Sequence, residues 1–462
     1  MLTKHSVVIG LIGLLMITAC AAPTTPNPPA ATPDIPTPVP TPASAPASIA
    51  AAEKLLDQLV QEDYAAILTN FDAAMQAALP EDKLKQAWTG VLAQYGAFQN
   101  RANTQFATHV DKYDVVIVMA RFEKGGLGLR ISVDAATGQI GGLFFTADTG
   151  KPMAYNVPAY VDTSKFNERE VTLGTGDWQL PGTLTLPKGD GPFPAVVLVH
   201  GSGPNDRDET IGPNKPFKDL AWGLASQGVA VLRYDKRSKV YGQQMAALTT
   251  LTVKEEVIDD AVTAVALLRQ QPGIDPKRVF VLGHSLGGYL APRIALAGPD
   301  IAGLIILAGA TRPLEDLILE QTEYIMSLSE STTHQAPIDQ LKEQIALVKA
   351  LKPGDEAKPA ILGAPPAYWL DLQNYRPAEL AKSVSKPMLI LQGMRDYQVR
   401  EADFVNWQQA LSTRSDVQLK TYPNLNHLFI TGDKESTPQE YQTAGSVDQT
   451  VIDDIAAWLK QR

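Results

Sequence analysis

Ser285 lies in a sequence pattern that can make a serine hydroxyl nucleophilic. It is the central residue of Gly283-His284-Ser285-Leu286-Gly287, a G-x-S-x-G match that follows an apolar run and opens a segment with helical spacing. A sharp turn from strand to helix holds a serine in a strained, exposed position, and glycines allow the close backbone approach that such a turn needs. The helix N-terminus then directs N–H groups and positive potential at a developing oxyanion. The pattern therefore predicts attack of Ser285 on a carbonyl carbon.

A serine hydroxyl needs a neighbouring base, and His427 is the histidine best placed to supply it. It lies in a loop just after the predicted strand over residues 417–422. The chain has six histidines, and the other five fall in the leader, the N-terminal region, the end of the first parallel strand, the turn itself and a polar stretch: His5, His109, His200, His284 and His334. We expect His427 to be the catalytic base.

The acid that orients the base should follow a strand between Ser285 and His427. The predicted strand over residues 388–392 runs directly into the loop that holds Asp396. An alternative is that Asp396 is a turn residue paired with a neighbouring arginine, Arg395 or Arg400. The second candidate acid is Asp371, but its surroundings indicate a helix rather than a strand end.

An oxyanion loop is expected after the first parallel strand, where the chain reads His200-Gly201-Ser202-Gly203. We expect the backbone N–H groups of Ser202 and Leu286 to be the two oxyanion donors, with the other three residues of the loop supporting it.

The residues after this loop, 205–210, are unusually polar. Two interpretations stay open for them. Arg207 forms an internal ion pair with Asp206 or Asp208 that shapes the loop, or the segment contacts the substrate directly.

Helices and strands must bring the predicted site residues together at one edge of a sheet. Strand-like and helix-like segments alternate from about residue 160 onward, which favours an open, mostly parallel sheet covered by helices on both faces. Ligands of such sheets bind at the carboxyl ends of the strands. The predicted strands are residues 168–173, 179–186, 194–200, 229–234, 278–282, 301–308, 386–392 and 417–422, and the predicted helices are 217–227, 255–270, 286–296 and 449–460.

With these motifs in chain order Ser285, Asp396, His427, residues 160–462 resemble the α/β-hydrolase superfamily. The loop over residues 200–210 and the turn around Ser285 resemble those of bacterial serine carboxylesterases that work outside the cytoplasm. The resemblance implies hydrolysis of a small-molecule carboxylic ester through an acyl-enzyme, with no cofactor and no metal ion.

One departure from a minimal hydrolase is a long insertion over residues 311–384. Apolar spacing at 314–326 and 338–351 predicts a helical cap over the pocket. Aromatic residues of the insertion are candidates for lining an acyl or alcohol site, with core packing as the alternative: Tyr324, Tyr368, Trp369 and Tyr375.

Residues 1–6 include a lysine and a histidine, and an almost unbroken apolar run over residues 7–19 follows them and precedes Cys20. The run is too short to span a membrane, which takes roughly 20 residues, so residues 1–19 are predicted to be a signal peptide. The residues before Cys20 resemble a bacterial lipobox, which implies lipidation of that thiol and an extracytoplasmic protein anchored to a membrane. A cleavable signal with a chance cysteine is the alternative. Residues 20–48 are rich in Pro, Ala and Thr and predict an extended tether.

Residues 49–150 predict a small α+β accessory domain without a catalytic constellation. Helical spacing at 51–79 and 81–94 is followed by strand-like runs at 113–122, 127–133 and 139–145. The region resembles the small N-terminal domain, of unassigned function, that precedes the hydrolase in some secreted bacterial esterases.

Composition and length argue against several classes of protein. A formal charge of -10 argues against a nucleic-acid partner, and a single cysteine excludes an intrachain disulfide and a multi-cysteine metal site. A peptidase of the prolyl oligopeptidase type shares the triad but normally needs a propeller, for which the N-terminal region is too short. Dehalogenases and epoxide hydrolases of this fold have Asp where Ser285 stands. The alternative from another class is a non-catalytic surface-binding protein built on a hydrolase fold.

Overall fold

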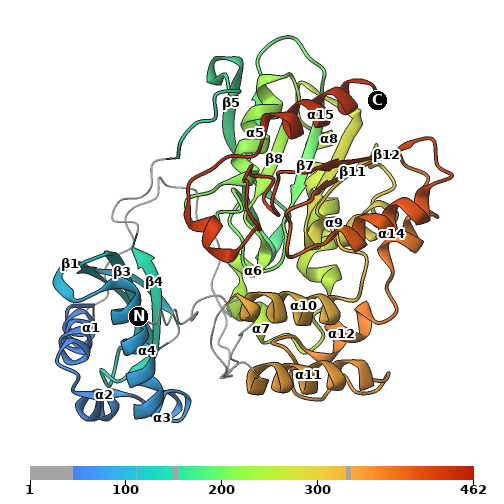
Figure 1. The fold of residues 1–462 in the computed structure, drawn as a ribbon. Helices are drawn as coiled ribbons and strands as arrows, with labels where there is room; N and C mark the ends of the chain where they lie inside the picture. Colours follow the sequence, from blue (N-terminus) through green and yellow to red (C-terminus); the bar gives the residue numbers. More distant parts are fainter. Residues whose placement is uncertain (1–44, 111, 149–154, 329–334) are drawn as a thin grey trace. The chain divides into compact units, whose positions relative to one another are not determined.

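The computed structural model describes residues 45–110, 112–148, 155–328 and 335–462 (Figure 1). They form two compact units, one before residue 149 and one from Tyr155 onward. The predicted signal peptide, Cys20 and most of the predicted tether lie outside the described residues, as does His334. Within the described ranges, no helix is long and apolar enough to cross a membrane.

The smaller unit begins with helices α1 (Ala45–Val60), α2 (Tyr64–Asn70), α3 (Ala73–Ala78) and α4 (Glu81–Tyr95). The single helix predicted over residues 51–79 is wrong, because Asp63 and Asp72 cap backbone amides and start new helices there. Helix α1 also takes in residues 45–48, the end of the predicted tether. Pro46 lies in its first turn, where the missing N–H costs no helical hydrogen bond.

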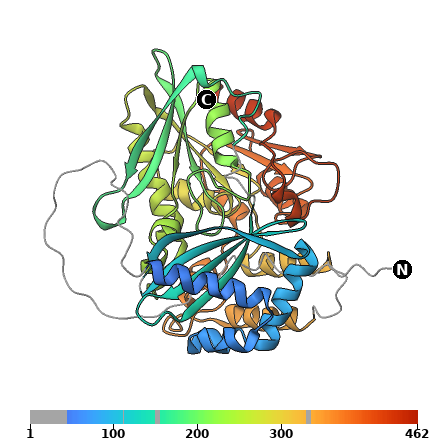
Figure 2. The ribbon, with the colours of Figure 1, turned by 90° about the vertical axis from the view of Figure 1, so that its left-hand side faces the viewer.

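An antiparallel sheet of order β1-β2-β3-β4 follows these helices. The sequence does not predict β1, because polar residues interrupt its alternation and its pairing with β2 shifts register at several places. Helix α1 lies against the sheet (Figure 2), and apolar side chains of both elements form the core of this unit. The strands are β1 (Phe98–Val110), β2 (Tyr113–Phe122), β3 (Gly125–Asp134) and β4 (Ile140–Asp148).

The larger unit is built on an eight-stranded sheet of order β12-β11-β10-β9-β7-β8-β6-β5. Strand β6 pairs antiparallel with both β5 and β8. The six strands from β7 to β12 pair in parallel, which confirms the predicted mostly parallel sheet. The strands are β5 (Phe166–Leu173), β6 (Leu180–Pro187), β7 (Phe193–Val199), β8 (Ala230–Tyr234), β9 (Ile274–His284), β10 (Leu304–Leu307), β11 (Met388–Gly393) and β12 (Val417–Tyr422).

Helices cover both faces of this sheet. Alternate residues of a strand point to opposite faces, so Val197 belongs to the core beneath α8 and α9, whereas Val196 belongs to the core beneath α5 and α15. Burial on both faces explains the continuous apolar runs of these strands. The helices are α5 (Pro216–Ser226), α6 (Arg237–Val240), α7 (Gly242–Ala246), α8 (Asp259–Arg269), α9 (Leu286–Ala297), α14 (Glu401–Leu411) and α15 (Gln449–Lys460), with a π-helical segment (Lys254–Ile258) and 3-10 turns at Thr163–Lys165, Gly176–Trp178 and Pro438–Gln442.

The chain between β10 and β11 forms a helical insertion. Its described helices are α10 (Leu314–Ser327), α11 (Gln335–Ala350), α12 (Pro366–Leu372) and α13 (Pro377–Ala381). The predicted helices over residues 314–326 and 338–351 correspond to α10 and α11. The loops that follow β7, β9, β11 and β12 contain the predicted site residues, so the parallel strands deliver these residues to one edge of the sheet.

Helix α9 offers a matched test of this packing. Ile294 is completely buried, whereas Leu296, two residues further on, is 52% exposed. We expect Ile294→Ala to lower the free energy of unfolding by about 2–5 kcal/mol, because it leaves a cavity beneath the sheet. Leu296→Ala should change it by less than about 0.5 kcal/mol. Urea unfolding followed by circular dichroism measures both; equal losses would contradict the packing of α9.

Candidate active site

Ser285 occupies the turn between β9 and α9 in a strained conformation, with φ 53° and ψ −114°. A positive φ is uncommon for a residue with a side chain. Its N–H donates to the carbonyl of Leu307 at 2.9 Å, which fixes the turn to β10. A Cβ on Gly283 would lie 2.3 Å from the Gly287 backbone, and one on Gly287 would lie 2.2 Å from the carbonyl oxygen of Val199. Only glycine fits at these two positions, as the predicted turn requires.

Asp396 and His427 meet at the same edge of the sheet. His427 Nδ1 and Asp396 Oδ2 are 2.7 Å apart, and both side chains are buried. The other carboxylate oxygen accepts N–H bonds from Gln398 at 2.7 Å and Val399 at 3.0 Å. These contacts fix the carboxylate against the ring, as an orienting acid and a base require. His284, beside Ser285, brings its ring centroid to 4.7 Å from that of His427, so the base lies next to the serine turn.

Asp371 and the two arginines near Asp396 all have other partners. Asp371 lies on α12 and forms a two-pronged ion pair with Arg293 of α9, at 2.8 and 2.9 Å, which links the insertion to the helix after Ser285. The arginines beside Asp396 pair with other carboxylates: Arg395 with Glu440 at 2.7 Å, and Arg400 with Glu320 at 3.6 Å. Asp396 is therefore free of both arginines and bonded to His427.

The predicted oxyanion loop lies against Ser285. A Cβ built on Gly201 would be 3.1 Å from Ser285 Cβ, so the loop backbone passes directly beside the serine. The Gly201 N–H donates to Glu209 Oε1 at 2.7 Å and is not available to an oxyanion. Among the described residues, no acceptor is recorded for the N–H groups of Ser202 and Leu286, the two predicted donors.

His200 supports this loop from below. Its Nε2 lies 3.0 Å from the carbonyl oxygen of Asp206, and its ring packs between Phe217 and Tyr234. Burial lowers the pKa of His200 to about 4, so the ring is neutral at physiological pH. Gly203, with φ 90°, turns the chain where a side chain would be strained.

The partners of Arg207 differ from both predicted ones. Its guanidinium contacts Asp235 at 3.1 Å and Glu170 at 2.5 Å, rather than Asp206 or Asp208. The side chain of Asp206 instead accepts amide bonds from within its own loop, and Asp208 pairs with Lys215 at 3.0 Å. Sequence proximity suggested the wrong partners, because the strands supply carboxylates that are distant in the chain. Arg207 thus ties the loop to β5 and to the end of β8, and the predicted pairing within the loop is wrong.

A buried pair of charged side chains that the sequence does not single out lies behind the serine turn. His284 Nδ1 is 2.8 Å from Glu209 Oε2, and His284 Nε2 is 2.9 Å from the carbonyl oxygen of His427. Burial opposes charge on both groups, but their mutual attraction outweighs it. The pKa of Glu209 therefore lies below its ordinary value and that of His284 above it. The charged pair joins the oxyanion loop, through Gly201, to the loop of the base.

The aromatic residues predicted to line the pocket are mostly core residues. The Tyr368 hydroxyl donates to Glu256 at 2.9 Å, Trp369 Nε1 to a backbone carbonyl at 2.8 Å, and the Tyr375 hydroxyl to the Tyr289 carbonyl at 2.7 Å. All three side chains are buried within the core cluster of the sheet. Their polar atoms are already satisfied by protein, which favours the packing alternative.

A different set of rings lies near the acid and base. Tyr324 of α10 stacks on Tyr397 with centroids 5.0 Å apart, and Tyr397 lies 6.2 Å from the ring of Tyr441. Tyr397 and Leu428, which directly follow Asp396 and His427, belong to the same apolar cluster. The rings therefore pack together next to the loops of Asp396 and His427, and of the three only Tyr324 was a predicted pocket residue.

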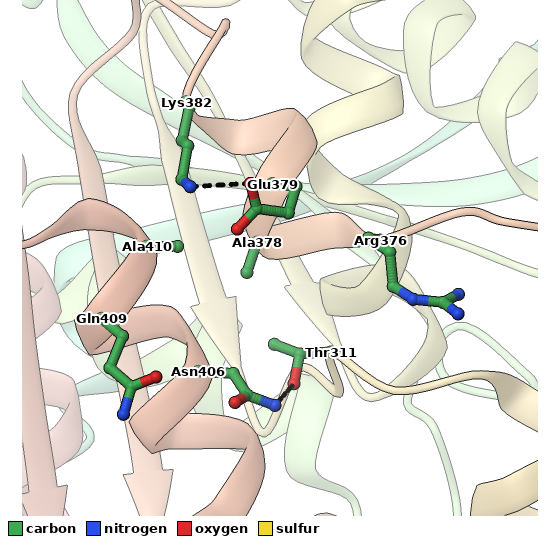
Figure 3. A pocket seen from close by; sticks show the side chains of 8 residues that line it. All are labelled: Thr311, Arg376, Ala378, Glu379, Lys382, Asn406, Gln409 and Ala410. Carbon is green, nitrogen blue, oxygen red and sulfur yellow. Dashed lines mark hydrogen bonds and ion pairs between the residues drawn. The ribbon is translucent and has the colours of Figure 1, made fainter.

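A cavity of about 260 Å³ lies away from this site, between α13 and α14 (Figure 3). Within it Lys382 pairs with Glu379 at 2.7 Å and Asn406 donates to Thr311 at 2.9 Å. None of the predicted site residues lines it; the lining residues are Thr311, Arg376, Ala378, Glu379, Lys382, Asn406, Gln409 and Ala410. Across the described part of the chain, no group of three or more His, Cys, Asp or Glu side chains is arranged to hold a metal ion.

The Glu209–His284 pair generates a stability prediction. Glu209→Ala leaves a buried imidazolium and the Gly201 N–H unpaired, so we expect it to lower the free energy of unfolding by about 3–5 kcal/mol. Glu209→Gln should cost less, because the amide can accept from Gly201 and donate to a neutral His284. Urea unfolding at pH 6 measures both variants. Parent-like stability of Glu209→Ala would contradict the role of the pair.

The stabilisation should also depend on pH in a defined window. The pKa of Glu209 is lowered from 4.5, so its contribution is complete above pH 4.5 and is lost as pH falls through the lowered pKa. The pKa of His284 is raised from 6.5, so its contribution is complete below pH 6.5 and is lost as pH rises through the raised pKa. The stability difference between parent and Glu209→Ala should therefore be largest between these two values. A difference that is independent of pH would refute the charged state of the pair.

Comparison with known proteins places this geometry in a family. The family model described as serine aminopeptidase, S33, matches residues 192–435, and that of a protein of unknown function, DUF3887, matches residues 52–143. Esterase EstD of Thermotoga maritima is 41% identical over 408 residues, which cover 87% of this chain and 93% of that protein.

Other similarities are more local. Acylamino-acid-releasing enzyme 1 of rice (Oryza sativa) is 26% identical over 172 residues, 35% of this chain and 21% of that protein. Among solved structures, an esterase of Pyrococcus furiosus is 17% identical with a TM-score of 0.40, over 64% of this chain and 91% of that one. The serine aminopeptidase family model spans more than half of this chain, and Esterase EstD aligns with most of the chain over nearly all of its own length. The chain therefore belongs to the α/β-hydrolase superfamily, in the family of Esterase EstD.

Proposed function

We propose that this protein is a serine carboxylesterase whose catalytic triad is Ser285, His427 and Asp396. The observation that carries the proposal is the buried 2.7 Å contact between His427 and Asp396, at the edge of the sheet where the strained Ser285 turn also lies. A base held by a carboxylate beside a half-buried serine is the arrangement that activates a hydroxyl for acyl transfer.

The reaction follows from these positions. Ser285 Oγ attacks the ester carbonyl carbon while His427 Nε2 takes its proton, and the N–H groups of Ser202 and Leu286 bind the oxyanion. The imidazolium, held by Asp396, returns the proton to the alcohol, which leaves an acyl-enzyme. Water then attacks the acyl carbon with the same base, which releases the acid and restores Ser285.

Esterase EstD supports the ester substrate, since it matches most of this chain. The description of the matching family as a serine aminopeptidase favours a second candidate, a peptidase or aminoacyl hydrolase with the same triad. The described part of the smaller unit consists of helices and one antiparallel sheet, which is not the propeller of prolyl oligopeptidases. A non-catalytic surface-binding protein would leave the triad without use.

Hydrolysis of short p-nitrophenyl esters tests these alternatives. We expect the parent to cleave them and Ser285→Ala to lose at least about 10³-fold in kcat, since the nucleophile is removed. The exposed Ser412 provides the control, and Ser412→Ala should keep parental activity. A parent that prefers aminoacyl p-nitroanilides would favour the peptidase. Parental activity of Ser285→Ala would overturn the assigned nucleophile, and an inactive parent would favour the surface-binding protein.

We further propose that the protein is a lipoprotein held outside the cytoplasm through acyl chains on Cys20. The proposal rests on the apolar run before Cys20, the small residues around it and the proline-rich segment after it. Acyl chains stabilise membrane binding by about 0.8 kcal/mol per buried methylene, so several chains give a durable anchor.

Metabolic labelling with an alkyne fatty acid tests the anchor. Expressed as the full chain in a bacterium, the parent should carry the label and sediment with membranes. Cys20→Ala should do neither, because the chain has no other cysteine. An unlabelled parent in the soluble fraction would instead support an ordinary cleavable signal.

A further inference from the structure

Lys236 is a buried cation that the mechanism so far does not use. It directly follows Asp235 at the end of β8, and its side chain is only 3% exposed. Its Nζ donates to the carbonyl oxygen of Gly201 at 2.9 Å and forms an ion pair with Glu256 at 2.7 Å. A buried ammonium is costly unless it is paired and hydrogen-bonded. Lys236 thus meets both needs, and one of its two partners is the oxyanion loop.

The bonded carbonyl belongs to the same peptide unit as the predicted oxyanion donor. The C=O of Gly201 and the N–H of Ser202 share one peptide plane, and the cis bond recorded among the described residues is elsewhere, at Gly191–Pro192. In a trans peptide the C=O and N–H point in opposite directions. An ammonium on the carbonyl oxygen therefore turns the Ser202 N–H away from Lys236 and withdraws electron density from it, which makes the N–H a stronger donor.

The neighbouring contacts keep this peptide in place. Glu209 holds the Gly201 N–H at 2.7 Å, on the preceding peptide unit. Asn205 Nδ2 donates a longer, neutral bond to the Gly201 carbonyl oxygen, at 3.3 Å. The backbone N–H of Lys236 donates to the Asn205 carbonyl at 3.0 Å, so the residue holds the loop by its backbone as well as its side chain.

Glu256 balances the charge of Lys236. Glu256 lies on the π-helical segment Lys254–Ile258 and also accepts a bond from the hydroxyl of Tyr368 on α12 at 2.9 Å. A continuous set of contacts therefore runs from α12 through Glu256 and Lys236 to the Gly201 carbonyl. Tyr368, a predicted pocket residue, is therefore connected to the oxyanion loop through Glu256 and Lys236.

We propose that Lys236 is a positioning residue for ester hydrolysis, which orients and polarises the Gly201–Ser202 peptide so that the Ser202 N–H binds the oxyanion. The inference rests on the proposed esterase function. It differs from a purely structural role, in which the Lys236–Glu256 ion pair would matter and the carbonyl contact would not.

Three variants separate these roles. Lys236→Met removes the ammonium from the Gly201 carbonyl. The double variant Lys236→Met/Glu256→Gln does the same without leaving an unpaired buried carboxylate. It keeps the test valid if the single variant folds poorly. Glu256→Gln alone breaks the ion pair but keeps the carbonyl contact. The exposed Lys239, three residues further along on α6, provides the matched control Lys239→Met.

The readouts are kcat/KM for a p-nitrophenyl ester and the inhibition constant of a trifluoromethyl ketone, which forms a tetrahedral oxyanion on the serine. Loss of an oxyanion donor lowers kcat by about 10²–10³-fold, so removal of the group that orients the donor should lower kcat/KM by about 10–100-fold. We expect this loss in both variants that lack Lys236, with KM nearly unchanged and inhibitor affinity reduced by a similar factor. Glu256→Gln should lose much less, and Lys239→Met should behave as the parent.

Parental kcat/KM in the variants that lack Lys236 would overturn the proposal. So would an equal loss in Glu256→Gln, or a loss of activity with unchanged inhibitor affinity, since either result assigns the effect to the ion pair or to general stability. If the parent cleaves no ester, the proposed function is wrong. The relative affinity of parent and Lys236→Met for the trifluoromethyl ketone then still decides the role of Lys236.

Discussion

The strained backbone of Ser285 is the constraint on which the larger unit depends. A positive φ at a residue with a side chain persists only where the surrounding structure imposes it. Here the β10 carbonyl of Leu307 binds the serine N–H, and glycines at 283 and 287 let α9 approach the ends of β9 and β7. The packed sheet and the buried α9 therefore hold the serine in position, and the same parallel strands bring Asp396 and His427 to its side.

Buried charges surround this turn in compensated pairs. Glu209, paired with His284, accepts a bond from the Gly201 N–H. Lys236, paired with Glu256, donates to the Gly201 carbonyl. Asp396 contacts His427. A buried charge is expensive alone, and here Glu209 and Lys236 each have an ionic partner and a backbone contact at Gly201. In the proposed esterase, fixed charges of this kind present donors to a developing oxyanion without reorganisation during the reaction.

The sequence predicts the architecture and the triad better than the supporting contacts. Strand ends and chain order are local properties, so they single out Ser285, Asp396 and His427 as candidates, and the structure confirms the mostly parallel sheet. Partner choice is a property of the folded chain. Arg207 therefore pairs with Glu170 of β5 and with Asp235 just after β8. The pair of Glu209 with His284 is likewise not visible in either segment alone. Capping by single aspartates likewise divided a predicted helix that apolar spacing made continuous.

Ser285 is the proposed nucleophile of an esterase, and the site of covalent labelling is the most direct measurement of that role. Full-length protein is treated with a fluorophosphonate, digested and mapped by mass spectrometry. The account predicts one equivalent of phosphonate on the peptide that contains Ser285, and none on the Asp396→Asn protein in the same time, because its base is no longer oriented. Label on a different serine, or an unlabelled Ser285 in folded parent protein, would contradict the account.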